Sequence, residues 1–346
     1  VWQLAEYANN PPSVQPRLHL FDFDQDGYEE ILFSVFNPRR FGQLIMIDDE
    51  EVQWEIPLSG RVTDLIDVKF NEDSPPLIAV STSLGQVHLY DHLRQQQLFR
   101  TLNLPVTRLV TFPLPEGNAL AVGTSAGTVI AYDQDGRRLW ESNLAENADR
   151  EILALSASPA FPSTNQPVLA ATLEAEDNDT NAADLVLLGS NGQTFNKIDD
   201  VDSVGLTRFV DSNRDQNNEL IIGHFATLEL LGLGVGSSEN VRDWEYTLDA
   251  APSAALVIDL DGNEEEELVI GTRDGRVHSL NNDRTLRWLH DVGGAISDLA
   301  ILPGEEDGES SIVVVRHDEQ NAVDATAWVE LRESKGEKIW EQNLDS

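Results

Sequence analysis

Cysteine is absent from the 346 residues of this sequence. Its absence excludes a disulfide framework, zinc sites built from thiolates and a cysteine nucleophile. It does not decide the compartment, because a large hydrophobic core can do without disulfides outside the cell as well as inside. We slightly favour an extracellular or periplasmic location over a cytoplasmic one.

Long apolar runs are also missing. No run approaches the roughly 20 residues that a membrane-spanning helix needs, and no basic segment followed by an apolar one marks a leader. Direct insertion into a membrane is therefore not expected. The chain begins with Val1 rather than Met, which leads us to expect a processed form or a part excised from a larger protein.

Positive charge is scarce. The sequence has 23 Lys and Arg residues against 61 Asp and Glu residues, which gives a formal net charge of -38. Such a surface repels phosphate backbones and anionic lipid headgroups, so we expect neither nucleic acid nor acidic membranes as partners. Cations and basic patches on other proteins are the natural attractants. Nothing in the composition indicates an oligomeric state.

Motifs of the common enzyme classes are missing as well. The sequence has no serine nucleophile elbow, no phosphate-cradling glycine loop and no dinucleotide fingerprint. Its seven histidines are scattered, without HxxH or HExxH spacing. Carboxylate pairs are uninformative in a chain with 61 acidic residues, so a glycosidase-like pair is simply unsupported. We therefore predict no catalytic residue.

What the sequence does contain is an internal repeat. An aromatic residue in a strand-like segment recurs about every 48 residues, a period typical of four-stranded propeller blades. The repeated residues are Trp2, Trp54, Phe99, Trp140, Phe195, Trp244, Trp288 and Trp340. A residue that recurs once per blade at one strand position indicates packing between neighbouring sheets, so we interpret these side chains as core.

Each period also contains three further strand-like segments in a fixed order. Residues 251–294 show them most clearly, as SAALVIDLD, EEELVIGTRD, GRVHSLN and TLRWLHDV. Short apolar runs between Gly, Asp and Asn turns predict strands joined in hairpins. The sequence therefore predicts an all-β fold, a seven-bladed β-propeller of four-stranded antiparallel blades, in a single domain over residues 1–346. The approximate blades are 15–59, 60–105, 106–147, 148–200, 201–250, 251–294 and 295–346.

Two details of the blades can be predicted. Gly85, Gly127 and Gly275 fall at equivalent points between the second and third strands, where we expect a two-residue turn with positive φ. Residues 1–10 are left over as an extra copy of an outer strand. They either add to or replace the outer strand of the last blade and so close the ring, or the chain is cut from a longer propeller array. We favour closure, because it protects sheet edges.

Three blades carry an acidic loop between their first two predicted strands. Residues with oxygen donors occupy its first, third, fifth and ninth positions, and the seventh can supply a side-chain or carbonyl oxygen. Alternate residues of a tight loop point inward, so this spacing can surround a hard cation with six to eight oxygen ligands, and calcium suits it better than magnesium. The candidate ligands are Asp22, Asp24, Asp26, Tyr28 and Glu30 in the first blade; Asp211, Asn213, Asp215, Asn217 and Glu219 in the fifth; and Asp259, Asp261, Asn263, Glu265 and Glu267 in the sixth.

A second interpretation of these loops needs no ion. Asp and Asn side chains can cap a hairpin by accepting hydrogen bonds from nearby backbone N–H groups. We expect calcium first at residues 22–30, which contain three Asp and a Gly, and after that at residues 211–219 and 259–267.

The acidic loops resemble the calcium loops of integrin α-type propellers, the FG-GAP or VCBS repeats. The surrounding blades, with an Asp/Gly turn before a Trp-bearing strand, are similar to quinoprotein-like propeller repeats. The resemblance implies calcium on one face of the disc and partners that dock elsewhere. It assigns ligand roles to Asp22, Asp24, Asp26, Glu30, Asp211, Asn213, Asp215, Glu219, Asp259, Asp261, Asn263 and Glu267.

Complete blades without an assembled catalytic motif favour a non-enzymatic propeller that binds or scaffolds a protein or glycan ligand. One alternative is a propeller enzyme, either a quinone-cofactor dehydrogenase or a polysaccharide-cleaving enzyme. Another is the ligand-sensing region of a multidomain receptor. Fold alone does not choose among them, because propellers host many unrelated functions.

Overall fold

The computed structural model describes residues 17–37, 41–48, 51–145, 150–159, 166–174, 182–202, 204–210, 219–224, 227–232, 241–263, 265–302, 308–317 and 327–343. These residues form β-strands joined by turns and contain no helix. Consequently, no helix in this part of the chain is long and apolar enough to span a membrane.

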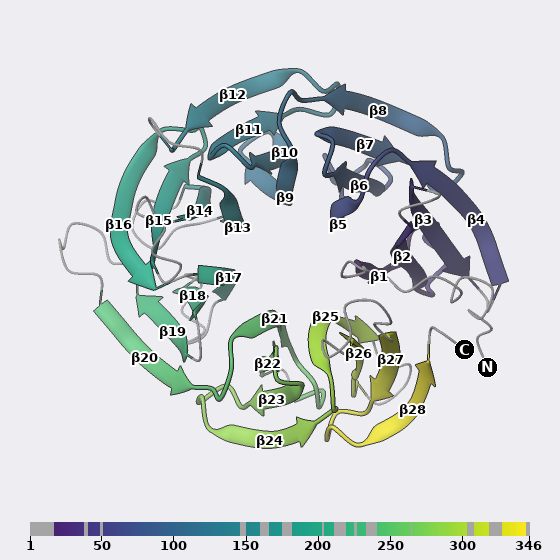
Figure 1. Cartoon of the computed structure of the whole chain (residues 1–346), viewed down its shortest axis with the longest axis vertical. Helices are drawn as coiled ribbons and strands as arrows, with labels where there is room; N and C mark the ends of the chain where they lie inside the picture. The colour runs from purple at the N-terminus through teal and green to yellow at the C-terminus, as the bar shows by residue number, and fades with distance from the viewer. Residues whose placement is uncertain are drawn as a thin grey trace. The chain divides into compact units, whose positions relative to one another are not determined.

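The described strands form seven four-stranded sheets, and in each sheet the strands are neighbours in chain order (Figure 1). Such antiparallel meanders are the blades of a β-propeller, so the predicted fold class is confirmed. Contacts group the chain into two compact units, Val1–Val62 with Asp249–Ser346, and Thr63–Leu248. The assignment of residues 1–346 to a single domain stays a prediction.

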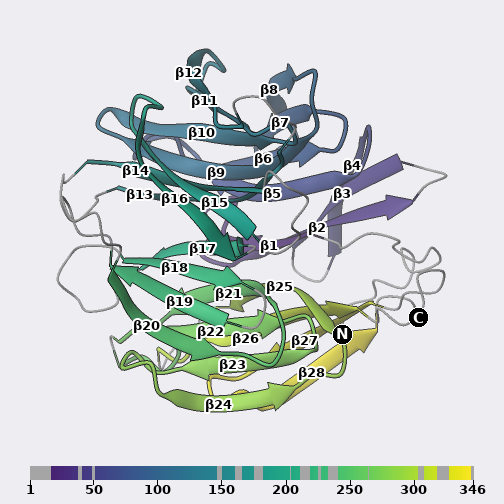
Figure 2. The same ribbon diagram turned by 60° about the vertical axis from the view of Figure 1, so that its left-hand side comes forward.

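The first unit contains three sheets, and Figure 2 shows the strands of one of them, β21 to β24, one below another in chain order. The strands of the three sheets are β1 (Leu18–Phe21), β2 (Glu30–Asn37), β3 (Phe41–Asp48) and β4 (Glu51–Leu58); β21 (Pro252–Ile258), β22 (Glu267–Thr272), β23 (Arg276–Leu280) and β24 (Leu286–Asp291); and β25 (Ala295–Leu302), β26 (Ser311–His317), β27 (Ala327–Arg332) and β28 (Lys338–Asn343).

The second unit contains the other four sheets. Their strands are β5 (Val62–Val68), β6 (Leu77–Thr82), β7 (Gln86–Tyr90) and β8 (Gln96–Thr101); β9 (Val106–Leu114), β10 (Gly117–Thr124), β11 (Thr128–Tyr132) and β12 (Arg138–Asn143); β13 (Ile152–Ser158), β14 (Val168–Glu174), β15 (Ala182–Gly189) and β16 (Thr194–Asp202); and β17 (Val204–Val210), β18 (Glu219–His224), β19 (Thr227–Gly232) and β20 (Val241–Thr247).

Apolar side chains fill the space between neighbouring sheets. Phe33 and Ile45 of the sheet β1 to β4 share a core with Val313 and Val315 of the sheet β25 to β28, so the first and last sheets of the chain are neighbours. A blade in such an arrangement is covered on both faces. Its middle strands therefore read as continuous apolar runs rather than alternating ones, and every residue of β22 is buried.

Two of the repeated tryptophans join one sheet to the next. The indole Nε1 of Trp140 donates to the carbonyl oxygen of Ser190 at 2.9 Å, and that of Trp288 donates to the carbonyl oxygen of Ser334 at 3.0 Å. Both acceptors lie in the turn between the third and fourth strands of the following sheet. Gly192 lies against the Trp140 ring, where a Cβ atom would come within 2.6 Å of ring carbons. The interpretation of these two tryptophans as packing between blades is confirmed.

Phe99 and Phe195 do not occupy the tryptophan position, contrary to our alignment. In the sheet registers, the residues equivalent to Trp140 are Leu98 in β8 and Asn196 in β16. A bulge precedes this position in both strands. The same bulge precedes Trp140 in β12, so the three strands correspond residue by residue, and choosing the nearest aromatic residue gave a register wrong by one in β8 and in β16.

The turn between second and third strands differs in length from the prediction. Gly85, Gly127 and Gly275 do have positive φ, at 78°, 68° and 86°. The turn has three residues rather than two, however, because β6 ends at Thr82 and β7 begins at Gln86, with equivalent gaps in the other two sheets. A three-residue hairpin loop ends in a left-handed residue, which explains the glycine.

The last sheet has four strands of its own, ending with β28. Residues 1–10, predicted to add to or replace an outer strand, lie outside the described residues.

Candidate metal centre

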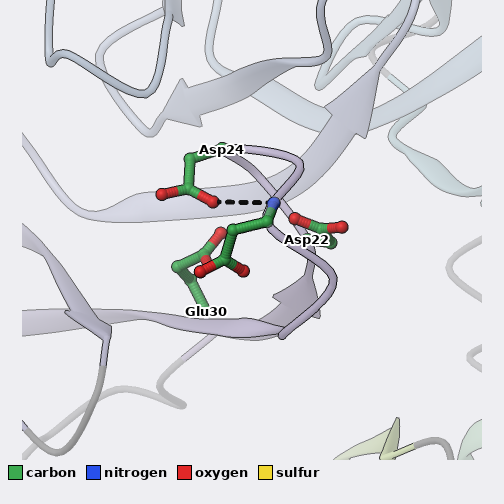
Figure 3. A group of neighbouring side chains, drawn as sticks. Asp22, Asp24 and Glu30 are labelled. Carbon is green, nitrogen blue, oxygen red and sulfur yellow. Dashed lines mark hydrogen bonds between the residues drawn. The ribbon is translucent and has the colours of Figure 1, made fainter.

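Four carboxylates meet in the loop between β1 and β2. Asp22, Asp24, Asp26 and Glu30 each offer one oxygen, and these four atoms all lie within 4.8 Å of one another. Figure 3 shows the labelled side chains converging from the loop and from the start of β2. The structure thus brings together the residues predicted at loop positions one, three, five and nine. Tyr28, at position seven, has an exposed side chain, and its role as a ligand stays a prediction.

The loop is folded by its own aspartates. Oδ2 of Asp22 accepts the Gly27 N–H at 3.1 Å, and Oδ1 of Asp24 accepts the Asp26 N–H at 3.1 Å. Oδ1 of Asp26 accepts the Tyr28 N–H at 2.9 Å. These are the side-chain to backbone bonds of the interpretation without an ion. They leave other carboxylate oxygens unused, among them Oδ1 of Asp22, which is buried without a partner.

Glu30 is the buried member of the group, with 1% of its surface exposed. Its Oε2 accepts a hydrogen bond from the Phe23 N–H, whereas its Oε1 is buried without a partner. Burial raises the pKa of Glu30 to about 7; the Phe23 N–H opposes this rise, and the charges of Asp24, Asp48 and Asp22 add to it. A buried carboxylate surrounded by other carboxylates is a position where a cation lowers the electrostatic energy.

A second cluster lies in the loop between β21 and β22. Asp259, Asp261 and Glu267 bring carboxylate oxygens within 4.8 Å of one another. Oδ1 of Asn263 is used within the loop, because it accepts the Glu265 N–H at 2.6 Å. The side chain of Glu265 is exposed and does not belong to the cluster.

This second cluster already contains a positive charge. Arg287 of β24 places its guanidinium 2.9 Å from Oδ2 of Asp261 and 3.3 Å from Oε1 of Glu267. Burial raises the pKa of Glu267; the Leu260 N–H and Arg287 oppose the rise, and Asp261 contributes to it. Sequence reasoning missed Arg287, which lies on the fourth strand. A comparison of the residues that precede the repeated tryptophans would have found it.

The third predicted loop is only partly described. Glu219, at its ninth position, is buried at the start of β18 and pairs with Val210 of β17. Asp211, Asn213, Asp215 and Asn217 lie outside the described residues, so their role as ligands stays a prediction.

Comparison with protein families gives one match. The PQQ_2 family, described as outer membrane protein assembly factor BamB, matches residues 28–183. This segment begins after Asp26 and ends before the second acidic cluster. The match supports the similarity to quinoprotein-like repeats and does not support the integrin α-type assignment of the acidic loops. No curated protein matches the sequence.

Solved structures share the fold at low sequence identity. The crystal structure of BBS1N in complex with ARL6DN, from a mercury soak, is 14% identical, with a TM-score of 0.65 over 94% of this chain and 91% of that one. Sqt1 from Chaetomium thermophilum is 12% identical, with a TM-score of 0.63 over 90% of this chain and 83% of that one. Residues 28–183 are therefore similar to the BamB-type PQQ_2 repeat, and nearly the whole chain shares the propeller fold of these structures.

Proposed function

We propose that this chain is a non-enzymatic propeller that binds a protein partner and is stabilised by calcium in the Asp22–Glu30 loop. The observation behind the calcium site is the Oε1 atom of Glu30, buried without a partner among three other carboxylates. Calcium takes six to eight oxygen ligands in adaptable geometry, so carboxylates, loop carbonyls and water can share its shell. Bound calcium would neutralise the mutual repulsion of the group.

Calorimetric titration of metal-free protein tests the site. We expect heat of binding and a rise in the melting temperature with calcium, because a ligand that binds only the folded state stabilises it. Asp24→Asn should weaken binding by roughly tenfold or more, since it removes one charged ligand. Asp73→Asn, at an exposed aspartate outside both clusters, is the matched control and should bind as the wild type. Absence of heat and of a thermal shift at millimolar calcium would contradict the proposal.

Three observations support a binding role. The similar BBS1N structure was determined in complex with ARL6DN. The matching family is described as an assembly factor. The net charge of -38 favours a partner with a basic surface. Glycans are the other ligand class that the sequence predicts.

Recovery of a partner from the native source, followed by reconstitution from purified proteins, tests this role. We expect binding between the two purified proteins to weaken as salt rises, because charge complementarity between exposed surfaces is screened. A captured protein that does not bind after purification would count against the proposal.

The family name also invites a test for a quinone cofactor. Protein mixed with the quinone and calcium should elute from gel filtration without visible absorbance. A coloured complex of fixed stoichiometry would favour the enzymatic alternative instead.

A further inference from the structure

We infer that Arg287 is the built-in cation of the Asp259–Glu267 loop, and that it keeps metal ions out of this loop. The guanidinium lies 2.9 Å from Oδ2 of Asp261 and 3.3 Å from Oε1 of Glu267, so it already pairs with two of the three carboxylates that a metal ion in this loop would share. A divalent ion at these oxygens would also lie beside a permanent positive charge, because arginine stays protonated at any ordinary pH.

The position of Arg287 comes from a β-bulge. Ser279 pairs with Trp288 and Leu280 pairs with Leu286, so Arg287 is an extra residue without a partner across the ladder. A bulge redirects the side chain of the extra residue. The start of β24, the end of β23 and the start of β22 lie at the same end of the sheet as the acidic loop. The redirected guanidinium therefore reaches the loop.

The first sheet has the same bulge with a different residue. Met46 pairs with Trp54 and Ile47 pairs with Val52, which makes Gln53 the extra residue in β4. Gln53 is exposed, brings no charge, and makes its two hydrogen bonds to Asp48 at 3.4 Å.

The consequence is visible at the buried glutamates. Oε1 of Glu30 is without a partner in the first sheet, whereas Oε1 of Glu267 faces Arg287 in the sixth. The two bulge residues also differ in exposure. Only 19% of the Arg287 side chain is accessible to solvent, whereas Gln53 is exposed. The residue at the bulge therefore separates a loop that lacks a cation from a loop that supplies its own.

Substitution of Arg287 tests the inference in a protein whose first loop can no longer bind calcium. This starting protein, called the parent below, carries Asp24→Asn and Asp26→Asn, which remove two exposed ligands of the first loop. Adding Arg287→Gln should create calcium binding roughly tenfold or more tighter than in the parent, because three carboxylates then lack a cation. Arg287→Lys keeps the charge and should create none. Adding Asp261→Asn to the Arg287→Gln protein should abolish the new binding.

The reciprocal substitution keeps the inference testable if the Arg287→Gln protein fails to fold. Gln53→Arg in the otherwise unchanged chain should weaken calcium binding by roughly tenfold or more while leaving the metal-free melting temperature unchanged or higher. Gln97→Arg is the matched control, because Gln97 is the bulge residue of β8 in a sheet without a described acidic cluster.

The outcomes separate this inference from the proposed function, on which only the reciprocal experiment depends. A wild-type protein without any calcium response defeats the calcium site of the first loop but leaves the Arg287 experiment intact. A folded Arg287→Gln protein that gains no calcium binding overturns the inference. Calcium binding by the parent that Asp261→Asn removes would overturn it as well, because the metal would then coexist with Arg287.

Discussion

The loops Asp22–Glu30 and Asp259–Glu267 have the same spacing of acidic residues but differ in the charge that surrounds them. Each joins the first two strands of its sheet and ends in a buried glutamate that accepts a backbone N–H seven residues earlier in the chain. In the first loop the carboxylates face one another without a positive side chain among their described contacts. In the second loop Arg287 stands between Asp261 and Glu267.

This difference shows that a loop motif does not by itself define a metal site. The ligands of the two loops are spaced alike, yet the charge that decides whether an ion is needed comes from the fourth strand of the sheet. Similar sequences in other propellers should be judged together with the bulge residue that precedes the tryptophan.

The largest effect should come from removing the internal cation. In chelator, Arg287→Ala should lower the free energy of unfolding by about 2 kcal/mol, because it leaves Glu267 buried without its charged partner. Urea unfolding measures the change. Gln53→Ala, at the equivalent bulge, should stay within about 0.5 kcal/mol of the wild type. Equal losses from the two substitutions would show that the bulge residues do not differ in role.

A smaller effect should come from the same substitution at the two buried glutamates. In chelator at about pH 8, Glu267→Gln should cost about 1 kcal/mol, because it weakens the contact with Arg287. Glu30→Gln should be neutral or stabilising, since it removes a charge that repels its neighbours. Urea unfolding of both proteins provides the comparison. A loss of stability on Glu30→Gln in the absence of metal would mean that this loop has a partner other than calcium.

Much of the fold could be predicted from sequence because similar residues recur at equivalent positions of successive blades. The tryptophans gave the period, and the glycines Gly85, Gly127 and Gly275 marked equivalent turns that the structure confirms as left-handed. The alignment was wrong at Phe99 because Arg94, with φ of 62°, occupies the left-handed position of the turn before the fourth strand, where other sheets have a glycine. An arginine does not indicate a left-handed conformation, so the turn could not be located from the sequence.

The acidic loops could also be located from sequence, because the ligand positions are local. Asp22, Asp24, Asp26 and Glu30 lie within nine residues, and the structure does bring them together. Arg287 could not be recognised in the same way. Its contact with Glu267 depends on a bulge and on the pairing of three strands, and a single sequence reveals neither.

The last effect concerns pH. Burial raises the pKa of Glu30 from 4.5 to about 7 in the metal-free chain. The folded state then binds this proton more tightly than the unfolded state. The resulting stability is complete below pH 4.5 and is lost as the pH rises through about 7.

We therefore expect the free energy of unfolding in chelator to fall between about pH 5 and about pH 7, and Glu30→Gln should flatten that fall. Glu267→Gln should flatten it less, because Arg287 opposes the rise in the pKa of Glu267. Calcium should remove the Glu30 contribution, since a metal ion holds its ligands ionised. Urea unfolding at a series of pH values measures all three slopes. Identical slopes for the wild type and Glu30→Gln would show that the repulsion in the first loop is relieved by other means.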